Sequence, residues 1–188
     1  MKVIILAGGK GSRFSGLTNS IPKPLINVNG KPIITRIIEH YSRFGFKNFI
    51  VPVGYKGEMI KSYFKNFDLN NSNLKVTFSP NKIVEYDKKF EGLSFQIIDT
   101  GLETLTALRL YKIKQFLNDE IFMLTYGDGL SDVNISHLLD FHKSHGKIGT
   151  MTIIRPPGRF GELELNKNSE ILYFKEKPKI SKGWINGG

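Results

Sequence analysis

Short apolar runs alternate with stretches of helical spacing along this chain, and this alternation constrains its fold most strongly. The runs that we expect to form strands lie at residues 3–6, 49–53, 95–98 and 121–124. Between them, apolar residues recur at the spacing of amphipathic helices within residues 32–41, 59–64 and 104–116. Such alternation is typical of βαβ units, whose strands pair in parallel. The sequence therefore predicts an α/β fold with a largely parallel sheet.

Weaker patterns cover the rest of the chain. We expect a further helix over residues 135–145 and short strands at residues 76–78, 149–154 and 171–174. The charged segment 81–92 has no clear periodicity and is expected to be a surface loop or hairpin. We also expect Pro32 to lie in the first turn of the helix within residues 32–41. Leu105, Leu108 and Ile113 should share one side of the helix within residues 104–116.

Size and composition indicate a single globular domain over residues 1–188. The chain has 188 residues, of which 40% are hydrophobic, which is enough for a sizeable core. It has no cysteine, so a disulfide framework and a cysteine-ligated zinc site are excluded, which fits a reducing compartment. The first apolar run is too short for a signal peptide, and no segment approaches the roughly 20 apolar residues of a membrane span. We therefore expect a soluble, cytoplasmic protein.

The formal charge of +10 and the pI near 9.7 indicate an anionic partner. Nucleic acid and small phosphorylated substrates are the two candidates. The lysines are dispersed along the sequence, and no helix-turn-helix, RNA-recognition or zinc-finger pattern accompanies them. A positive cleft for substrates that carry several phosphates is therefore favoured over nucleic-acid binding.

A glycine-rich segment follows the first apolar run and is the leading candidate site. Residues 3–6 run directly into Ala7-Gly8-Gly9-Lys10-Gly11-Ser12-Arg13. Glycines allow bare N–H groups to turn toward an anion. Ser12 adds a hydroxyl, while Arg13 and the downstream Lys23 add cations that could neutralise phosphate charge. The spacing matches neither a Walker loop nor a dinucleotide-binding fingerprint. The alternative is a tight turn beside solvated charges.

Asp128 is a candidate metal ligand because it follows the apolar run 121–124 within the segment Thr125-Tyr126-Gly127-Asp128-Gly129. Ligands bind beyond the carboxyl ends of parallel strands. Mg²⁺ usually combines one or two carboxylates with substrate phosphates. The alternative is an ordinary Asp-Gly turn.

Three histidines, His137, His142 and His145, fall within the predicted helix 135–145. Their spacing is not that of a zinc helix, and metal sites demand a definite geometry. We interpret them as surface or packing residues.

The segment GGKGSR at residues 8–13, followed by PKPL at residues 22–25, resembles the signature of the sugar nucleotidyltransferases. Ser12 replaces the threonine usual in that family and keeps the hydroxyl. Further matches extend to the end of the chain, and they are most similar to the cytidylyltransferase branch. They lie at residues 54–56, 99–101, 125–129, 156–161, 176–178 and 186–188. Segment 81–92 resembles the insertion that distinguishes this branch.

The resemblance implies a Rossmann-like three-layer fold of the nucleotide-diphospho-sugar transferase type, with a mostly parallel (mixed) central sheet. It implies transfer of a nucleotidyl group from CTP to glucose 1-phosphate with Mg²⁺, and Arg13, Lys23 and Asp128 as catalytic residues. The implied nucleotide-binding residues are Leu6, Ala7, Gly8, Gly9, Lys10, Gly11, Ser12, Arg13, Lys23, Thr104, Arg109 and Asp128. Other nucleoside triphosphates (UTP, dTTP or GTP) and a catalytically impaired nucleotide-binding fragment remain as alternatives.

For Arg109, the resemblance to the family and the residues alone indicate different roles. The resemblance implies that it helps to read the cytosine edge, whereas a helix-surface ion pair is the plain alternative. The chain also departs from the family here, because Thr106-Ala107-Leu108-Arg109 replaces Thr-Gly-Gly-Arg. The added side chains of Ala107 and Leu108 could crowd a base.

For the sugar phosphate, the resemblance implies contacts by Gly161, Glu176, Lys177 and Asn186, with residues 156–161 shaping the hexose pocket. Members of the family continue beyond the last matching motif and supply a second metal-binding aspartate and much of a homo-oligomeric contact. The chain is therefore expected to be C-terminally incomplete relative to the family.

Overall fold

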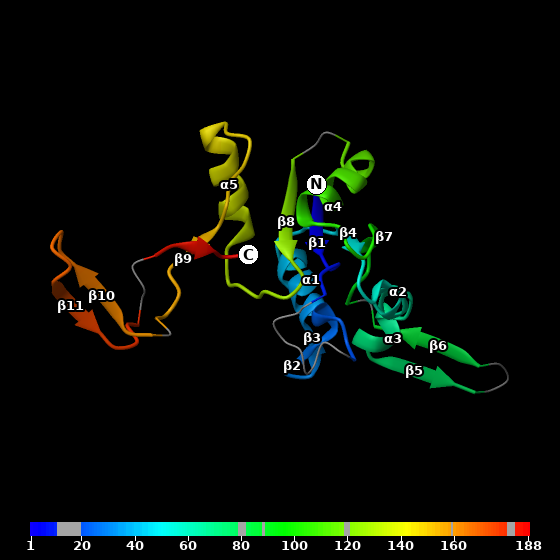
Figure 1. The fold of residues 1–188 in the computed structure, drawn as a ribbon. Coiled ribbons are helices and arrows are strands. Elements are labelled where there is room, and N and C mark those ends of the chain that lie inside the picture. The colour runs from blue at the N-terminus through cyan, green and yellow to red at the C-terminus, as the bar shows by residue number, and fades with distance from the viewer. Residues whose placement is uncertain (11–19, 79–81, 88, 119–120, 159, 180–182) are drawn as a thin grey trace. The chain divides into compact units, whose positions relative to one another are not determined.

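The computed structural model describes residues 1–10, 20–78, 82–87, 89–118, 121–158, 160–179 and 183–188. These residues form two compact units, Met1–Leu130 and Ser131–Gly188, which we describe separately (Figure 1). The expectation of a single domain over residues 1–188 stays a prediction.

A four-stranded parallel sheet forms the centre of the first unit. Its strands are β1 (Lys2–Leu6), β4 (Asn48–Val53), β7 (Ser94–Asp99) and β8 (Phe122–Tyr126). The spatial order is β7-β4-β1-β8, and every pair is parallel. Val3, Ile4 and Ile5 are fully buried, as expected for a strand covered on both faces. The predicted parallel sheet is confirmed.

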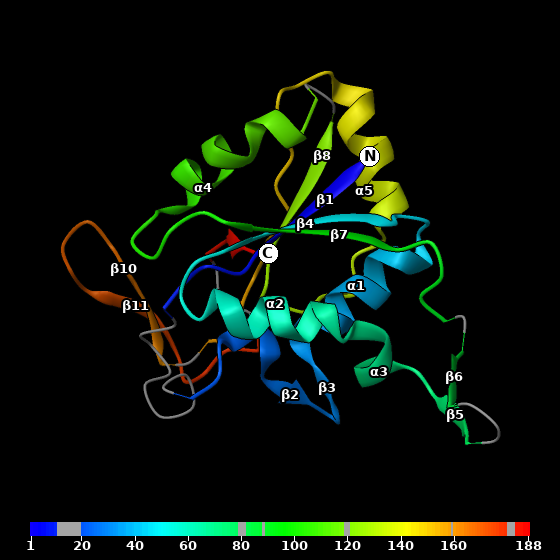
Figure 2. The same cartoon turned by 90° about the vertical axis from the view of Figure 1, so that its right-hand side faces the viewer.

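Helices cover both faces of this sheet, with α1 (Ile33–Arg43) and α2 (Gly57–Lys65) on one face and α4 (Thr106–Ile113) on the other (Figure 2). Side chains of successive strand residues alternate between these faces. On the α4 face, Ile4 and Ile50 pack with Ile113 and Leu117. On the α2 face, the rings of Phe49, Phe95 and Phe64 pack together, Phe49 against Phe95 and Phe95 against Phe64.

Two details of the helix predictions are wrong. Leu105 and Leu108 do not share a buried side with Ile113, because they are 80% and 48% exposed while Ile113 is fully buried. The buried residues of α4 are Arg109 and Ile113, four positions apart. Pro32 is not in the first helical turn either: it closes β3 (Lys31–Pro32), and α1 begins at Ile33.

Shorter elements complete the first unit. They are η2 (Lys23–Leu25), β2 (Asn27–Val28), α3 (Phe67–Asn71), β5 (Leu74–Thr77), β6 (Ile83–Tyr86) and η3 (Lys114–Phe116). Strand β2 pairs with β3, and β5 pairs with β6, both in antiparallel fashion. The β5–β6 hairpin contains part of the charged segment 81–92, in agreement with the expected loop or hairpin.

The second unit contains one helix and two small sheets. Helix α5 (Ile135–His145) begins at Asn134, whose side chain accepts a hydrogen bond from the His137 backbone N–H. Strand β10 (Glu162–Leu165) pairs antiparallel with β11 (Ile171–Lys175), and β9 (Ile153–Ile154) pairs with β12 (Ile185–Asn186). The strand predicted over residues 149–154 is therefore limited to its last two residues. Over the described residues of both units, no helix is long and apolar enough to cross a bilayer.

The strand order determines where a ligand can bind. The chain moves outward from β1 to β4 and β7, and then returns to place β8 on the other side of β1. The sequence-consecutive strands β1 and β4 therefore pair on one side of β1, while the later strand β8 pairs on its other side. In open α/β sheets, the crevice beyond the carboxyl ends of two such strands is the usual ligand site.

Glu39 of α1 joins this helix to two other segments and makes the stability of the first unit depend on pH. Its carboxylate is 15% exposed and accepts hydrogen bonds from Lys31 at 2.7 Å and Lys89 at 2.8 Å. Burial alone would raise the pKa of Glu39, but the hydrogen bonds from the two lysines outweigh it and lower the pKa. Such a carboxylate stabilises the fold above its unfolded pKa and loses this effect as the pH falls through its folded pKa.

We expect Glu39→Gln to lower the free energy of unfolding at pH 7 by about 1.5–3 kcal/mol, the range for hydrogen bonds to a charged group. The difference from the unaltered chain should shrink as the pH falls from 7 to 3, because Glu39 of the unfolded chain takes up a proton before Glu39 of the folded chain does. Urea titrations at several pH values between 7 and 3 measure this difference in the free energy of unfolding. Glu58→Gln is the matched control, since Glu58 is 83% exposed and pairs with Lys61 on the same helix. A difference that is constant with pH would contradict this account.

Candidate active site

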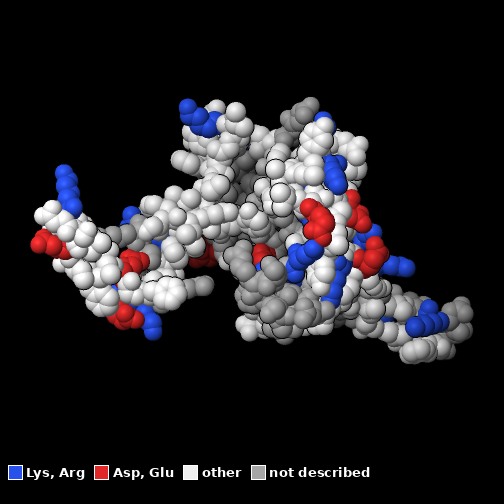
Figure 3. All heavy atoms as spheres, in the orientation of Figure 1, with Lys and Arg blue, Asp and Glu red and all other residues white. Residues whose placement is uncertain are grey.

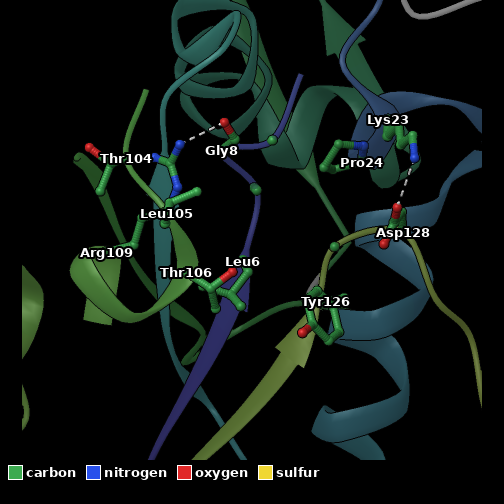
Figure 4. A pocket seen from close by; sticks show the side chains of 13 residues that line it. Leu6, Gly8, Lys23, Pro24, Thr104, Leu105, Thr106, Arg109, Tyr126 and Asp128 are labelled. Carbon is green, nitrogen blue, oxygen red and sulfur yellow. Dashed lines mark hydrogen bonds and ion pairs between the residues drawn. The ribbon is translucent and has the colours of Figure 1, made fainter. Parts of the chain in front are cut away.

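A cavity of about 310 Å³ lies at the crevice beyond β1 and β8 (Figure 4). Its walls come from the end of β1, from η2, from the segment leading into α4 and from the end of β8. The lining residues are Leu6, Ala7, Gly8, Gly9, Lys23, Pro24, Thr104, Leu105, Thr106, Arg109, Tyr126, Gly127 and Asp128. Segments far apart in the sequence therefore meet where the strand order predicts a ligand site.

Most of the nucleotide-binding residues expected from the sequence line this cavity. These are Leu6, Ala7, Gly8, Gly9, Lys23, Thr104, Arg109 and Asp128. Lys10 is not among the lining residues and instead pairs with Glu103 on the protein surface. Gly11, Ser12 and Arg13 lie outside the described residues. The assignment of roles to these side chains stays a prediction.

Lys23 and Asp128 form an ion pair at one side of the cavity, with Nζ 3.3 Å from Oδ2 (Figure 4). Lys23 is 18% exposed and Asp128 is 43% exposed, so both groups can reach a ligand. The backbone N–H of Gly127 donates to Leu6 O at 2.9 Å, and this bond ties the turn that carries Asp128 to the end of β1. The cavity thus presents a cation and an anion side by side.

Asp128 provides one of the ligands that a Mg²⁺ site requires. Its carboxylate offers the hard oxygen donors that Mg²⁺ prefers. Among the described residues, no three His, Cys, Asp or Glu side chains gather closely enough to hold a metal by themselves. A site with one carboxylate must be completed by water and by phosphate oxygens of a ligand, and Mg²⁺ commonly binds in this way.

Arg109 lies at the floor of the cavity and is 5% exposed. Its Nη1 donates to Val53 O at 3.0 Å, Thr100 Oγ1 at 2.5 Å and Gly101 O at 2.9 Å. Its Nη2 donates to Gly8 O at 2.9 Å and lies 3.4 Å from Leu102 O. Burial lowers the pKa of Arg109, and Asp99 opposes this effect. The alternative of a helix-surface ion pair is therefore wrong, because the guanidinium is buried and bonded to the backbone.

Thr104 is also held by its neighbours. Its hydroxyl donates to Thr100 O at 2.6 Å and accepts from Lys112 Nζ at 3.3 Å. Ala107 and Leu108 are not among the residues that line the cavity, and the expected crowding of a base by their side chains stays a prediction. Tyr126, Leu105 and Thr106 line it without having been predicted as site residues. Tyr126 could have been noticed, because it directly precedes the Gly127-Asp128 turn.

In the second unit, two of the residues expected to bind sugar phosphate lie close together. A Cβ on Gly161 would lie 3.1 Å from Glu176 Oε2 and 2.6 Å from the ring of Phe174, so a glycine is needed for this approach. Lys177 has a left-handed backbone with φ of 41°. Asn186 lies in β12, where its Oδ1 accepts from the backbone N–H of Gly188.

The histidines of α5 make local contacts. Nδ1 of His142 and Nε2 of His145 lie 2.9 Å and 2.8 Å from Thr150 Oγ1. These contacts accord with a packing role, and the interpretation stays a prediction.

We expect Gly127→Ala to destabilise the chain by about 1–3 kcal/mol, the usual cost of overpacking. A Cβ at this position would lie 2.8 Å from Leu6 O and 3.0 Å from Pro24 Cγ, so β8 or η2 would have to move. Gly129→Ala is the matched control two residues away, because a Cβ there meets nothing within 4 Å. Urea unfolding of both variants measures the difference, and equal stabilities would refute the close packing of this turn.

Comparison with known proteins agrees with this geometry. The sequence matches the family described as nucleotidyl transferase over residues 2–188. It is 42% identical to a glucose-1-phosphate cytidylyltransferase of Salmonella typhimurium, covering all of this chain and 73% of the relative. It is 40% identical to a probable glucose-1-phosphate cytidylyltransferase of Bacillus subtilis, with the same coverage of both chains.

A solved structure supports the fold independently. The chain superposes on a putative glucose-1-phosphate thymidylyltransferase from Bacillus anthracis with a TM-score of 0.66 at 20% identity, covering all of this chain and 69% of the other. At that identity the likeness speaks for the fold alone. The family match over nearly the whole sequence, together with the two relatives, leads to one conclusion: this chain belongs to the nucleotidyl transferase family.

Proposed function

We propose that this protein is a glucose-1-phosphate cytidylyltransferase, which forms CDP-glucose and pyrophosphate from CTP and glucose 1-phosphate. The observation that carries the proposal is the 40–42% identity to relatives of that name over the whole chain. The cavity beyond β1 and β8 supports it, because backbone glycines, a lysine and a carboxylate line the same crevice. Triphosphate recognition needs groups of these kinds.

In the proposed reaction, a phosphate oxygen of glucose 1-phosphate attacks the α-phosphorus of CTP. The bond from that phosphorus to the bridging oxygen breaks, and pyrophosphate leaves with the electron pair. The attacking oxygen is already anionic, so no protein base has to remove a proton. The protein therefore acts by positioning the two substrates and by offsetting their negative charge.

Lys23 and the glycine segment are the groups best placed for that work in the described part of the site. The backbone at Gly8 and Gly9 lines the cavity without side chains, so phosphate oxygens can approach it closely. The Lys23 ammonium supplies a point charge at the cavity wall. Arg13, which lies outside the described residues, is proposed as a second cation. Asp128 would hold Mg²⁺, which when bound neutralises charge on the phosphate oxygens.

For the sugar phosphate, we propose Gly161, Glu176, Lys177 and Asn186 as binding residues. The approach of Glu176 to the backbone of Gly161 supports this pairing. A carboxylate accepts hydrogen bonds from hexose hydroxyls, and a lysine can pair with the phosphate.

On the face seen in Figure 3, the described charges of Met1–Leu130 do not favour nucleic acid as the anionic partner. On the visible face of Met1–Leu130, Lys and Arg side chains are interspersed with Asp and Glu (Figure 3). A nucleic-acid site is expected to gather its basic residues into a patch or stripe.

The decisive experiment is pyrophosphate release by the 188-residue chain with Mg²⁺, glucose 1-phosphate and each of CTP, UTP, dTTP, GTP and ATP in turn. We expect release with CTP to exceed that with the others. Greatest release with another triphosphate would reassign the substrate within the family. Mg²⁺-dependent binding of CTP by folded protein without any release would instead identify a nucleotide-binding chain that lacks the chemistry.

We expect Lys23→Met to lower kcat by about 10²-fold, which is typical for loss of one group that stabilises transition-state charge. The free energy of unfolding should change by less than about 1 kcal/mol, because the ion pair to Asp128 is partly exposed. Steady-state pyrophosphate release and urea unfolding measure the two quantities. Lys61→Met is the matched control, since Lys61 also pairs with a carboxylate but lies on α2 and does not line the cavity. Near-normal turnover of Lys23→Met would remove Lys23 from the mechanism.

A further inference from the structure

Arg155 and Trp184 face each other across the strand pair β9–β12 of the second unit. This pair is antiparallel, with Ile153 opposite Asn186, and the same register places Arg155 opposite Trp184. The Arg155 guanidinium lies over the Trp184 ring, with Cζ 4.4 Å from the ring centroid. Side chains alternate between the two faces of a strand pair. Arg155 and Trp184 therefore share a face with Asn186, one of the residues proposed to bind sugar phosphate.

Two contacts connect the chain after β9 to the Glu176-Lys177-Pro178 segment, which carries two more of the proposed sugar-phosphate residues. The backbone N–H of Gly158 donates to Pro178 O at 2.8 Å. A Cβ on Gly161 would lie 3.1 Å from Glu176 Oε2. Arg155 therefore precedes the stretch that joins the β9–β12 pair to this segment.

The stacking of Arg155 leaves its donors available to an anion. A guanidinium that lies over an aromatic ring uses its flat face, whereas its N–H groups point outward in the plane. Among the residues that the structure describes, no carboxylate pairs with this side chain. Arg155 is exposed, so a ligand can reach its donors. A planar fork of donors matches two oxygens of a phosphate group.

The proposed reaction calls for positive charge at the sugar phosphate. The attacking phosphate oxygen is anionic and must approach the α-phosphate of CTP, which is also anionic. Cations that contact either phosphate lower this repulsion. Of the four residues proposed so far for the sugar phosphate, only Lys177 is a cation.

We propose that Arg155 binds the phosphate group of the sugar phosphate, and that Trp184 positions the guanidinium for this contact. The proposal rests on the proposed function in taking a sugar phosphate as the ligand of the second unit. It adds a second cation to Lys177, and it assigns Trp184 a role that acts through Arg155.

Calorimetric titration of the 188-residue chain with glucose 1-phosphate tests the contact, with Mg²⁺ and both with and without a non-hydrolysable CTP analogue. We expect Arg155→Met to raise the Kd of glucose 1-phosphate about tenfold or more, as for loss of a hydrogen bond between charged groups. Arg155→Lys keeps the charge without the fork and should fall between. Trp184→Leu should raise this Kd about two- to fivefold, the effect of losing an exposed cation–π contact. The Kd of the CTP analogue should stay unchanged in all three variants.

Lys167→Met is the matched control. Lys167 lies in the turn between β10 and β11, so this variant removes one positive charge from the second unit without altering the β9–β12 pair. Its affinity for glucose 1-phosphate should equal that of the unaltered chain. Circular dichroism establishes that each variant is folded.

Trp184 fluorescence gives a local readout that does not depend on turnover. Trp184 is the only tryptophan in the sequence and is 57% exposed. We expect glucose 1-phosphate to change its emission in a saturable way, and inorganic phosphate to compete. Glucose at equal concentration should have a much smaller effect. In Arg155→Met, the midpoint of the titration should move to higher concentration by the factor found by calorimetry.

The outcomes are distinct. An unchanged Kd in Arg155→Met, or an equal rise in Lys167→Met, would overturn the proposal and leave Arg155 and Trp184 as a surface packing pair. Binding of glucose 1-phosphate without any change in Trp184 emission would overturn it too. If the unaltered chain bound glucose 1-phosphate but released no pyrophosphate, the proposed function would fail, while the Kd values of the variants would still decide the role of Arg155. No binding of glucose 1-phosphate under either condition would overturn the proposal itself.

Discussion

Parallel pairing of four strands is the constraint on which the rest of this structure depends. Because β7, β4, β1 and β8 run in the same direction, the segments that follow them all emerge at one edge of the sheet. The glycine segment, the Gly54 turn, the Thr100-Gly101 turn and the Gly127-Asp128 turn therefore come together although they are distant in sequence. The position of the cavity follows from this strand arrangement, whereas the lining residues determine its chemistry.

Close approach of backbones at that edge explains the choice of residue at several positions. Gly127 lies so near Leu6 O that a methyl group would push β8 from β1, and Gly8 and Gly54 leave room for the guanidinium of Arg109. Lys23 reaches Asp128 from η2 because that turn packs beside Gly127 through Pro24. The polar groups of the site are thus positioned by contacts of the main chain more than by contacts among themselves.

Periodicity predicted the sheet well and the site only in part. The runs at residues 3–6 and 49–53 were recognisable because strands buried on both faces are apolar without interruption. The buried face of α4 was not predictable in the same way. Counting apolar residues favoured Leu105 and Leu108, whereas the structure buries Arg109, a residue that carries no apolar signal. The pairing of Lys23 with Asp128 joins residues 105 positions apart, so only the resemblance to a known family could place them together. Residues 11–13 remain a prediction from sequence.

The acceptors around Arg109 also determine how the cavity behaves as an electric field. Arginine begins from so high a pKa that burial does not discharge it under physiological conditions. Its charge is met by carbonyl oxygens and a hydroxyl, none of which titrates. The charge of Arg109 itself is therefore constant across the pH range in which histidines and carboxylates change state. An anionic ligand meets the same charge on Arg109 in acidic and in neutral solution, and a pH dependence of its binding must come from the ligand's own phosphates or from other groups around the cavity.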